Sequence, residues 1–112
     1  MGTMIQSYRL GEEDYRGQEF IAHEHPLGGN NDLLSITQPG IIEEIHRKYL
    51  VAGSDIIFTN TFSSTSIAQA DYHLESAAYN INIHAAKIAK KVVMEFNRDA
   101  PDSPRFVAGS VG

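Results

Sequence analysis

Three hydrogen-bonding side chains, Thr59, Asn60 and Thr61, directly follow the apolar run at 56–58. An unbroken apolar run of this kind is typical of a parallel strand that is covered on both faces. Ligands of parallel α/β folds bind at the carboxyl ends of the strands, so these side chains are candidates for lining a substrate pocket. Capping of the loop is the alternative, because Asn and Thr often bond to nearby backbone groups.

Histidines and a short acidic run are the other residues that could bind a metal or transfer protons. Zinc sites need three or four convergent ligands, whereas the five histidines are scattered along the chain. Glu12, Glu13 and Asp14 are expected on an exposed helix face, and His46 near the polar side of another helix. We therefore predict no catalytic residue and no metal ligand here, the histidines considered being His23, His25, His46, His73 and His84.

Apolar periodicity predicts the elements that position these residues. In the clearest helix Pro39 suits the first turn and Thr37 can cap it. Gly53 suits the position just past a helix, where a positive φ is common. Helices that alternate with strands indicate parallel βαβ units, and hence an α/β fold. The predicted elements are helices over 38–52 and about 75–96, strands over 55–59 and 105–112, and a short helix within 12–20 of an otherwise irregular opening.

The composition is that of one globular domain. The chain has 112 residues, a formal net charge of −5 and no cysteine. The acidic balance argues against a nucleic-acid surface, and the lack of cysteine fits a reducing compartment and excludes a thiolate metal site in this chain. No apolar run approaches the roughly 20 residues that span a bilayer, and no signal peptide precedes the fold. These features predict a soluble, cytoplasmic protein without a nucleic-acid or membrane partner.

The predicted elements are too few for a complete α/β sheet. Two short strands cannot form a closed or doubly covered sheet, and the apolar faces of both helices need one to pack on. We therefore expect the chain to be a segment of a larger α/β protein, with low stability on its own. Its exposed strand edges would then favour self-association.

Several ordered sequence blocks resemble the N-terminal homocysteine-binding module of cobalamin-dependent methionine synthase. The likeness runs over essentially all 112 residues, and so many blocks in one order make it specific. The blocks are Gly2-Thr3-Met4-Ile5-Gln6, Tyr15-Arg16-Gly17, Gly29-Asn30-Asn31-Asp32-Leu33-Leu34, Ala52-Gly53-Ser54-Asp55-Ile56-Ile57, Thr59-Asn60-Thr61-Phe62, Ala68-Gln69-Ala70-Asp71-Tyr72 and Arg105-Phe106-Val107-Ala108-Gly109-Ser110-Val111-Gly112.

The resemblance implies that residues 1–112 are the N-terminal part of a homocysteine-binding domain. Its fold would be an incomplete (β/α)8 TIM barrel, about strands 2–3 and helices 1–2. In the complete enzyme, zinc lowers the pKa of the homocysteine thiol, and the thiolate takes a methyl group from methylcobalamin, which folate reloads. The resemblance thus implies homocysteine as the ligand, with zinc and cobalamin as cofactors of the parent protein and none within this chain.

The same resemblance suggests further substrate-binding residues. Gly2 and Thr3 could offer backbone N–H groups to the substrate carboxylate, the alternative being a plain tight turn. Asn30, Asn31 and Asp32 could approach the mouth of the pocket, the alternative being a turn that locks the long first loop. The polar triplet after the strand would line the pocket itself.

Three departures from the family pattern bear on activity. The zinc ligands of the family are three cysteines from late barrel strands, and this chain has none. Of the family motif Asp-Gly-Gly-Met-Gly-Thr only Met1-Gly2-Thr3 is present, and Phe58 stands where methionine synthases usually carry Glu. We therefore expect the chain alone to be inactive, and leave open whether it counts as an enzyme by itself. The alternative is a non-catalytic binding or assembly module that pairs with a partner chain.

Overall fold

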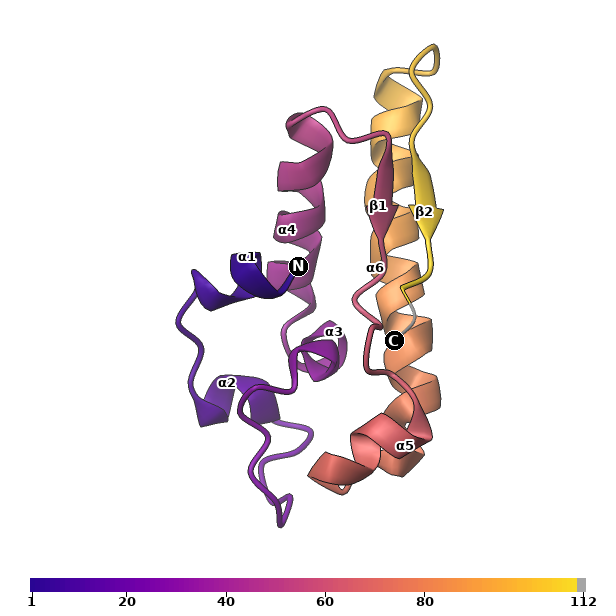
Figure 1. The fold of residues 1–112 in the computed structure, drawn as a ribbon. Helices are drawn as coiled ribbons and strands as arrows, with labels where there is room; N and C mark the ends of the chain where they lie inside the picture. Colours follow the sequence, from indigo (N-terminus) through magenta and orange to yellow (C-terminus); the bar gives the residue numbers. More distant parts are fainter. Residues whose placement is uncertain (111–112) are drawn as a thin grey trace.

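The computed structural model describes residues 1–110, which form a mixed α/β structure with one small parallel sheet at one side (Figure 1). Strand β1 (Ile56–Phe58) pairs in parallel with strand β2 (Phe106–Ala108), and Ile57 lies opposite Val107. The long helix α6 (Ala78–Asp99) connects the two strands. The predicted order of helix, strand, helix and strand, and the parallel pairing, are therefore confirmed. The strand predicted over 105–112 is shorter, and positions 111–112 lie outside the described residues.

The predicted irregular opening contains several short helical turns. The helix predicted within 12–20 is present but ends earlier. The elements other than β1, β2 and α6 are α1 (Gly2–Gln6), α2 (Glu12–Arg16), η1 (Asn31–Leu33), α3 (Leu34–Thr37), α4 (Pro39–Val51), α5 (Ser66–Gln69), η2 (Ala70–Tyr72) and η3 (Glu75–Ala77).

Helix α4 matches the helix predicted over 38–52 to within a residue at each end. Pro39 occupies its first turn, where the missing N–H costs no hydrogen bond. Gly53 follows the helix with φ of 106°, which agrees with its predicted place past the helix end. The predicted cap is wrong: Thr37 ends the preceding helix α3, and its hydroxyl donates to the carbonyl oxygen of Leu33 at 3.4 Å. The prediction that His46 lies near the polar side is also wrong, because its side chain is buried.

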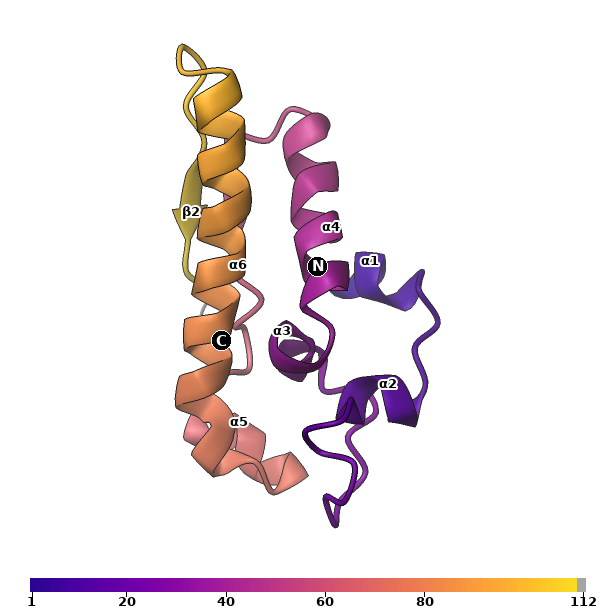
Figure 2. The same ribbon diagram turned by 180° about the vertical axis from the view of Figure 1, so that it is seen from behind.

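Helix α6 corresponds to the helix predicted over about 75–96, although residues 75–77 form the separate turn η3, and it covers one face of the sheet (Figure 2). The buried side chain of Ile57 packs in a cluster with residues of both long helices: Leu50, Ala89, Val92 and Val93. A second cluster joins the opening segment to the amino-terminal halves of α4 and α6; it contains Ile5, Tyr15, Leu27, Leu33, Leu34, Ile42, Ile45, Leu74 and Ile81. No helix within residues 1–110 combines the length and the apolar character needed to cross a membrane.

The other face of the sheet has no cover within the described residues. Ile56, Phe58 and Phe106 are 50%, 60% and 56% exposed on that face. The prediction of a strand buried on both sides is therefore wrong for residues 1–110: burial alternates along β1, as expected for a sheet that packs helices on one side only.

Candidate functional site

The carboxyl end of β1 borders a polar cavity of about 500 Å³. This volume lies within the range of about 300–1,000 Å³ that small-molecule sites usually have. Backbone turns and side chains from five separate segments form its walls. The lining residues are Met1, Gly2, Gly29, Asn30, Asn31, Asp32, Phe58, Thr59, Asn60, Thr61, Phe62, Ser63, Tyr72 and Ser110.

Thr59 and Thr61 link the ends of the two strands at this cavity. Their hydroxyl oxygens lie 2.6 Å apart; the Thr61 hydroxyl donates to the carbonyl oxygen of Ser110 at 2.8 Å, and the Ser110 amide donates to Thr59 Oγ1 at 3.2 Å. Both threonines are only 8% exposed. The two interpretations of these residues are therefore compatible, because the same side chains line the cavity and cap the loop.

Asn60 connects the strand end to the first loop. Its Nδ2 donates to the carbonyl oxygen of Asn31 at 2.8 Å, although the two residues are 29 positions apart. Asn31 Oδ1 in turn accepts the Tyr15 hydroxyl at 3.0 Å. The first loop is thus fixed over the carboxyl end of β1 by a chain of three polar side chains.

Asp32 is the one carboxylic acid among the lining residues. One of its oxygens, Oδ2, accepts the Ser63 amide at 2.6 Å and the Ser64 hydroxyl at 2.8 Å. Burial raises the pKa of Asp32, and the bonds from Ser64 and Ser63 act in the opposite direction. The side chain therefore lines the cavity and also holds the first loop against the loop after β1.

A buried pair of side-chain amides, those of Asn30 and Gln69, holds together the segments that carry Asp32 and Ser63. Asn30 Nδ2 donates to Gln69 Oε1 at 2.8 Å, and Gln69 Nε2 donates to Asn30 Oδ1 at 3.2 Å and to the Ser63 carbonyl oxygen at 3.0 Å. Gln69 has no exposed surface, so its full set of hydrogen bonds is needed to offset the cost of burying it. The pairing joins segments 39 positions apart, a contact that no local sequence pattern signals.

The remaining predicted residues divide between the cavity and its surroundings. Gly2 lies at the start of α1 and lines the cavity, whereas Thr3 is exposed and lies outside the lining. Sequence reasoning did not single out Tyr72 or Ser110 as site residues, although both fall within blocks that resemble the family. Phe58 and Phe62 supply aromatic surface, and no carboxylate stands at the position of Phe58.

The residues present do not fit a zinc site. Within residues 1–110 no group of three or more His, Asp or Glu side chains could hold a metal ion, and the sequence has no cysteine. Two of the histidines already have hydrogen-bond partners. His23 Nε2 is bonded to the Tyr72 carbonyl oxygen, and His73 Nδ1 is bonded to the Glu24 carboxylate. A zinc-dependent step therefore cannot be assigned to these side chains.

The fold and the cavity are both typical of α/β proteins. The chain has parallel strands linked by a helix, and a polar cavity at the carboxyl end of a strand, which is where α/β enzymes bind their substrates. The family model described as homocysteine S-methyltransferase matches residues 1–112. The chain therefore belongs to the homocysteine S-methyltransferase family.

Proposed function

We propose that the chain forms the homocysteine-binding wall of a methionine synthase, as the N-terminal part of its homocysteine-binding domain. The parent reaction would transfer a methyl group from methylcobalamin to the homocysteine thiol. The two strands and the long helices would be a segment of a (β/α)8 barrel. The observation that carries the proposal is the polar cavity at the end of β1, in a chain of this family.

The polar atoms left free in the cavity suit an amino acid. Among residues 1–110 no hydrogen bond reaches Asn31 Nδ2, Asn60 Oδ1 or Asp32 Oδ1, and none of these atoms is fully buried. Asp32 Oδ1 can accept a hydrogen bond from an ammonium group, and Asn31 Nδ2 can donate one to a carboxylate. Both charged groups of homocysteine would thereby find partners of the right type.

The aromatic side of the cavity suits the rest of homocysteine. Phe58 and Phe62 lie beside the polar groups and offer apolar surface to the two methylene groups and the sulfur. Zinc in the parent protein would activate the thiol, but the side chains of residues 1–110 do not provide its ligands. We therefore propose that the chain binds the substrate and does not methylate it when alone.

Binding can be tested by titrating the ¹⁵N-labelled chain with L-homocysteine under reducing conditions. We expect amide shifts that saturate and are largest at 29–32 and 59–63. Asn60→Ala should weaken binding on the order of tenfold, because it removes an oxygen that faces the ligand and releases the Asn31 loop. Asn80→Ala, a matched change at an exposed position of α6, should leave binding unchanged.

Two results would contradict the proposal. One is a folded chain whose amide spectrum does not respond to millimolar homocysteine. The other is an Asn60→Ala variant that binds as well as the Asn80→Ala control. Formation of methionine by the purified chain, supplied with methylcobalamin and zinc, would refute the narrower statement that it is inactive alone.

One observation favours a second function, that of an assembly module. Ile56, Phe58 and Phe106 form an exposed apolar face on the sheet. Exposed apolar patches and free strand edges often mark surfaces for association. Sedimentation at several concentrations separates the two proposals: a monomer that binds homocysteine supports the first, and an oligomer that does not bind it supports the second.

A further inference from the structure

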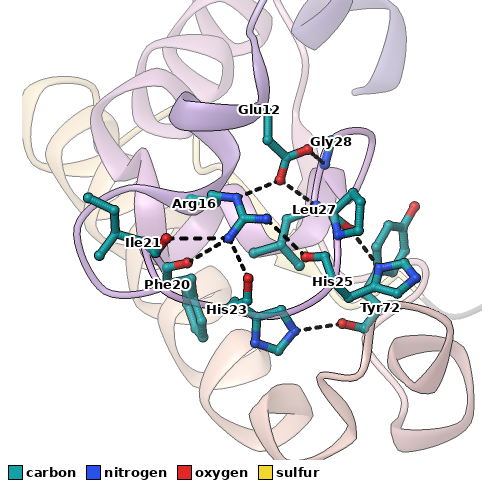
Figure 3. A network of polar contacts seen from close by, with 10 residues as sticks. Glu12, Arg16, Phe20, Ile21, His23, His25, Leu27, Gly28 and Tyr72 are labelled. Atoms are coloured by element: carbon teal, nitrogen blue, oxygen red, sulfur yellow. Dashed lines mark hydrogen bonds and ion pairs between the residues drawn. The ribbon is translucent and has the colours of Figure 1, made fainter.

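The loop between α2 and the cavity is organised by a single guanidinium group (Figure 3). Arg16 Nη1 donates to the carbonyl oxygens of Phe20, Ile21 and His23 at 3.3, 3.5 and 2.6 Å, and Nη2 donates to that of His25 at 3.3 Å. The side chain is 19% exposed, so these contacts are largely shielded from water. One side chain therefore gathers four carbonyls of an otherwise irregular loop.

Glu12 holds the far end of the same loop. Its carboxylate accepts Arg16 Nε at 2.8 Å, the Leu27 amide at 2.6 Å and the Gly28 amide at 2.8 Å (Figure 3). The Leu27 amide is the main cause that lowers the pKa of Glu12, and the Gly28 amide and Arg16 add to it. Since Glu12 and Arg16 also bind each other, the pair ties the beginning of the loop to its end.

Two routes lead from this pair to the wall of the cavity. The first is along the chain: Gly28 is followed directly by the lining residue Gly29, whose φ of 89° suits glycine. The second runs through His23, whose Nε2 lies 2.9 Å from the carbonyl oxygen of the lining residue Tyr72. The two routes meet, because a Cβ added at Gly29 would lie 3.7 Å from the Tyr72 hydroxyl.

We propose that Glu12 and Arg16 are positioning residues for the substrate cavity. Neither lines it, yet together they set the place of the wall that starts at Gly29 and of Tyr72 opposite. The inference rests on the proposed function for its ligand, L-homocysteine. It extends that function by assigning a role to Arg16, a residue of the Tyr15-Arg16-Gly17 block.

The test compares Arg16, which binds the carbonyl groups of the loop, with Arg47, which forms ion pairs on the two long helices. Arg16→Gln removes the guanidinium from the loop, and Arg47→Gln removes the ion pairs that Arg47 makes with Glu43 and Glu95 on α4 and α6. We expect Arg16→Gln to weaken homocysteine binding on the order of tenfold, because the hydrogen bonds of a charged group are lost. Arg47→Gln should leave the dissociation constant unchanged even if it lowers the melting temperature.

Arg16→Lys and Glu12→Gln extend the comparison. Lysine keeps a positive charge for Glu12 but lacks the planar fork that reaches several carbonyls, so it should not restore binding. Glu12→Gln keeps one acceptor oxygen and should therefore fold. It should weaken homocysteine binding, but by less than Arg16→Gln does. It should also speed hydrogen exchange of the Leu27 and Gly28 amides, a readout independent of the ligand.

These experiments distinguish failure of the positioning role from failure of the proposed function. The positioning role is overturned if Arg16→Gln, measured where it is folded, binds homocysteine as tightly as the unchanged chain, or if Arg47→Gln weakens binding equally. If the unchanged chain does not bind homocysteine, the proposed function fails, and amide spectra of the variants decide the positioning role. Shifts at 29–32 and at Tyr72 in Arg16→Gln but not in Arg47→Gln would support it, and their absence would overturn it.

Discussion

Replacing His46 should change how the chain responds to acid. The imidazole is 1% exposed, and within residues 1–110 neither ring nitrogen has a hydrogen-bond partner. Burial lowers the pKa of His46 from 6.5 to about 4, and the positive charge of the Met1 amino group acts in the same direction. The folded protein therefore holds this histidine neutral at pH values where the unfolded chain protonates it.

The size of the effect follows from the two pKa values. Their difference, 6.5 minus about 4, is about 2.5, and each pKa unit corresponds to about 1.36 kcal/mol, which gives about 3 kcal/mol. Because the folded-state pKa is lowered, this stability is fully present above pH 6.5 and is lost as the pH falls from 6.5 to about 4. Such a loss is a large fraction of the about 5–15 kcal/mol by which a domain is usually stable.

The assay is urea unfolding followed by circular dichroism between pH 4 and pH 8. His46→Leu should be at least as stable as the unchanged chain at pH 7, because it removes two unpartnered buried nitrogens, and a cavity of about 250 Å³ beside residue 46 leaves room for the side chain. The difference in unfolding free energy should then widen by about 3 kcal/mol toward pH 4. His84→Gln, at an exposed position of α6, serves as the control.

A pH-independent difference between His46→Leu and the unchanged chain would refute this reasoning. It would mean that the imidazole is protonated in the folded state or that water satisfies it. Using the difference between the two proteins matters, because the other ionisable groups are common to both and cancel.

Further predictions concern the loop, the sheet and the cavity. Gly53→Ala should lower the unfolding free energy by about 1 kcal/mol, because φ at this position is 106°. Gly40→Ala should raise it by roughly 0.5–1 kcal/mol, because Gly40 lies in helix α4 and an added Cβ meets no other atom. Thermal melts of both variants measure the two changes. Phe58→Ser should change the unfolding free energy by less than about 0.5 kcal/mol, since the ring is 60% exposed, and sedimentation should show less self-association. Burial raises the pKa of Asp32, so the contribution of this group to stability is present below pH 3.8 and is lost as the pH rises through the raised pKa; in urea titrations Asp32→Asn should lack this contribution when compared with the unchanged chain.

The sequence was sufficient for the elements whose signal is local. The spacing of Ile41, Ile42, Ile45 and Leu50 defines α4 because a helix brings such positions to one face. The same rule explains why the prediction for His46 is wrong. Position 46 is four residues after Ile42 and so lies on the apolar face, and its polar side chain concealed this.

The covering of a strand could not be read from its own residues. An apolar run such as Ile56-Ile57-Phe58 is the same whether one layer or two layers of structure pack on it. In residues 1–110 the helices cover only the side of Ile57, and the neighbouring residues of β1 are exposed. What packs against a strand is a property of the whole sheet, and the local sequence does not carry it.

The candidate site could be predicted in part for a similar reason. The position of Thr59, Asn60 and Thr61 at the end of β1 follows from the rule on parallel strands, and these residues do line a cavity. Their partners do not follow from any such rule, since the contacts to Asn31 and Ser110 span 29 and 49 positions. Long-range pairs of this kind depend on the tertiary fold.

The way in which these polar groups are paired bears on what the cavity can bind. The hydroxyl groups of Thr59 and Thr61 are hydrogen-bonded to each other and to the backbone of Ser110. They are therefore held in place and have few hydrogen-bonding positions left for a ligand. Within residues 1–110, the lining side-chain atoms without a hydrogen bond include Asn31 Nδ2, Asn60 Oδ1 and Asp32 Oδ1, which come from the first loop and the strand end. A site of this design loses little conformational entropy on binding, because its donors and acceptors are already fixed. If homocysteine binds as proposed, binding would also require the first loop to stay in place, and Glu12 and Arg16, which hold this loop, would then matter for the ligand although they do not touch the cavity.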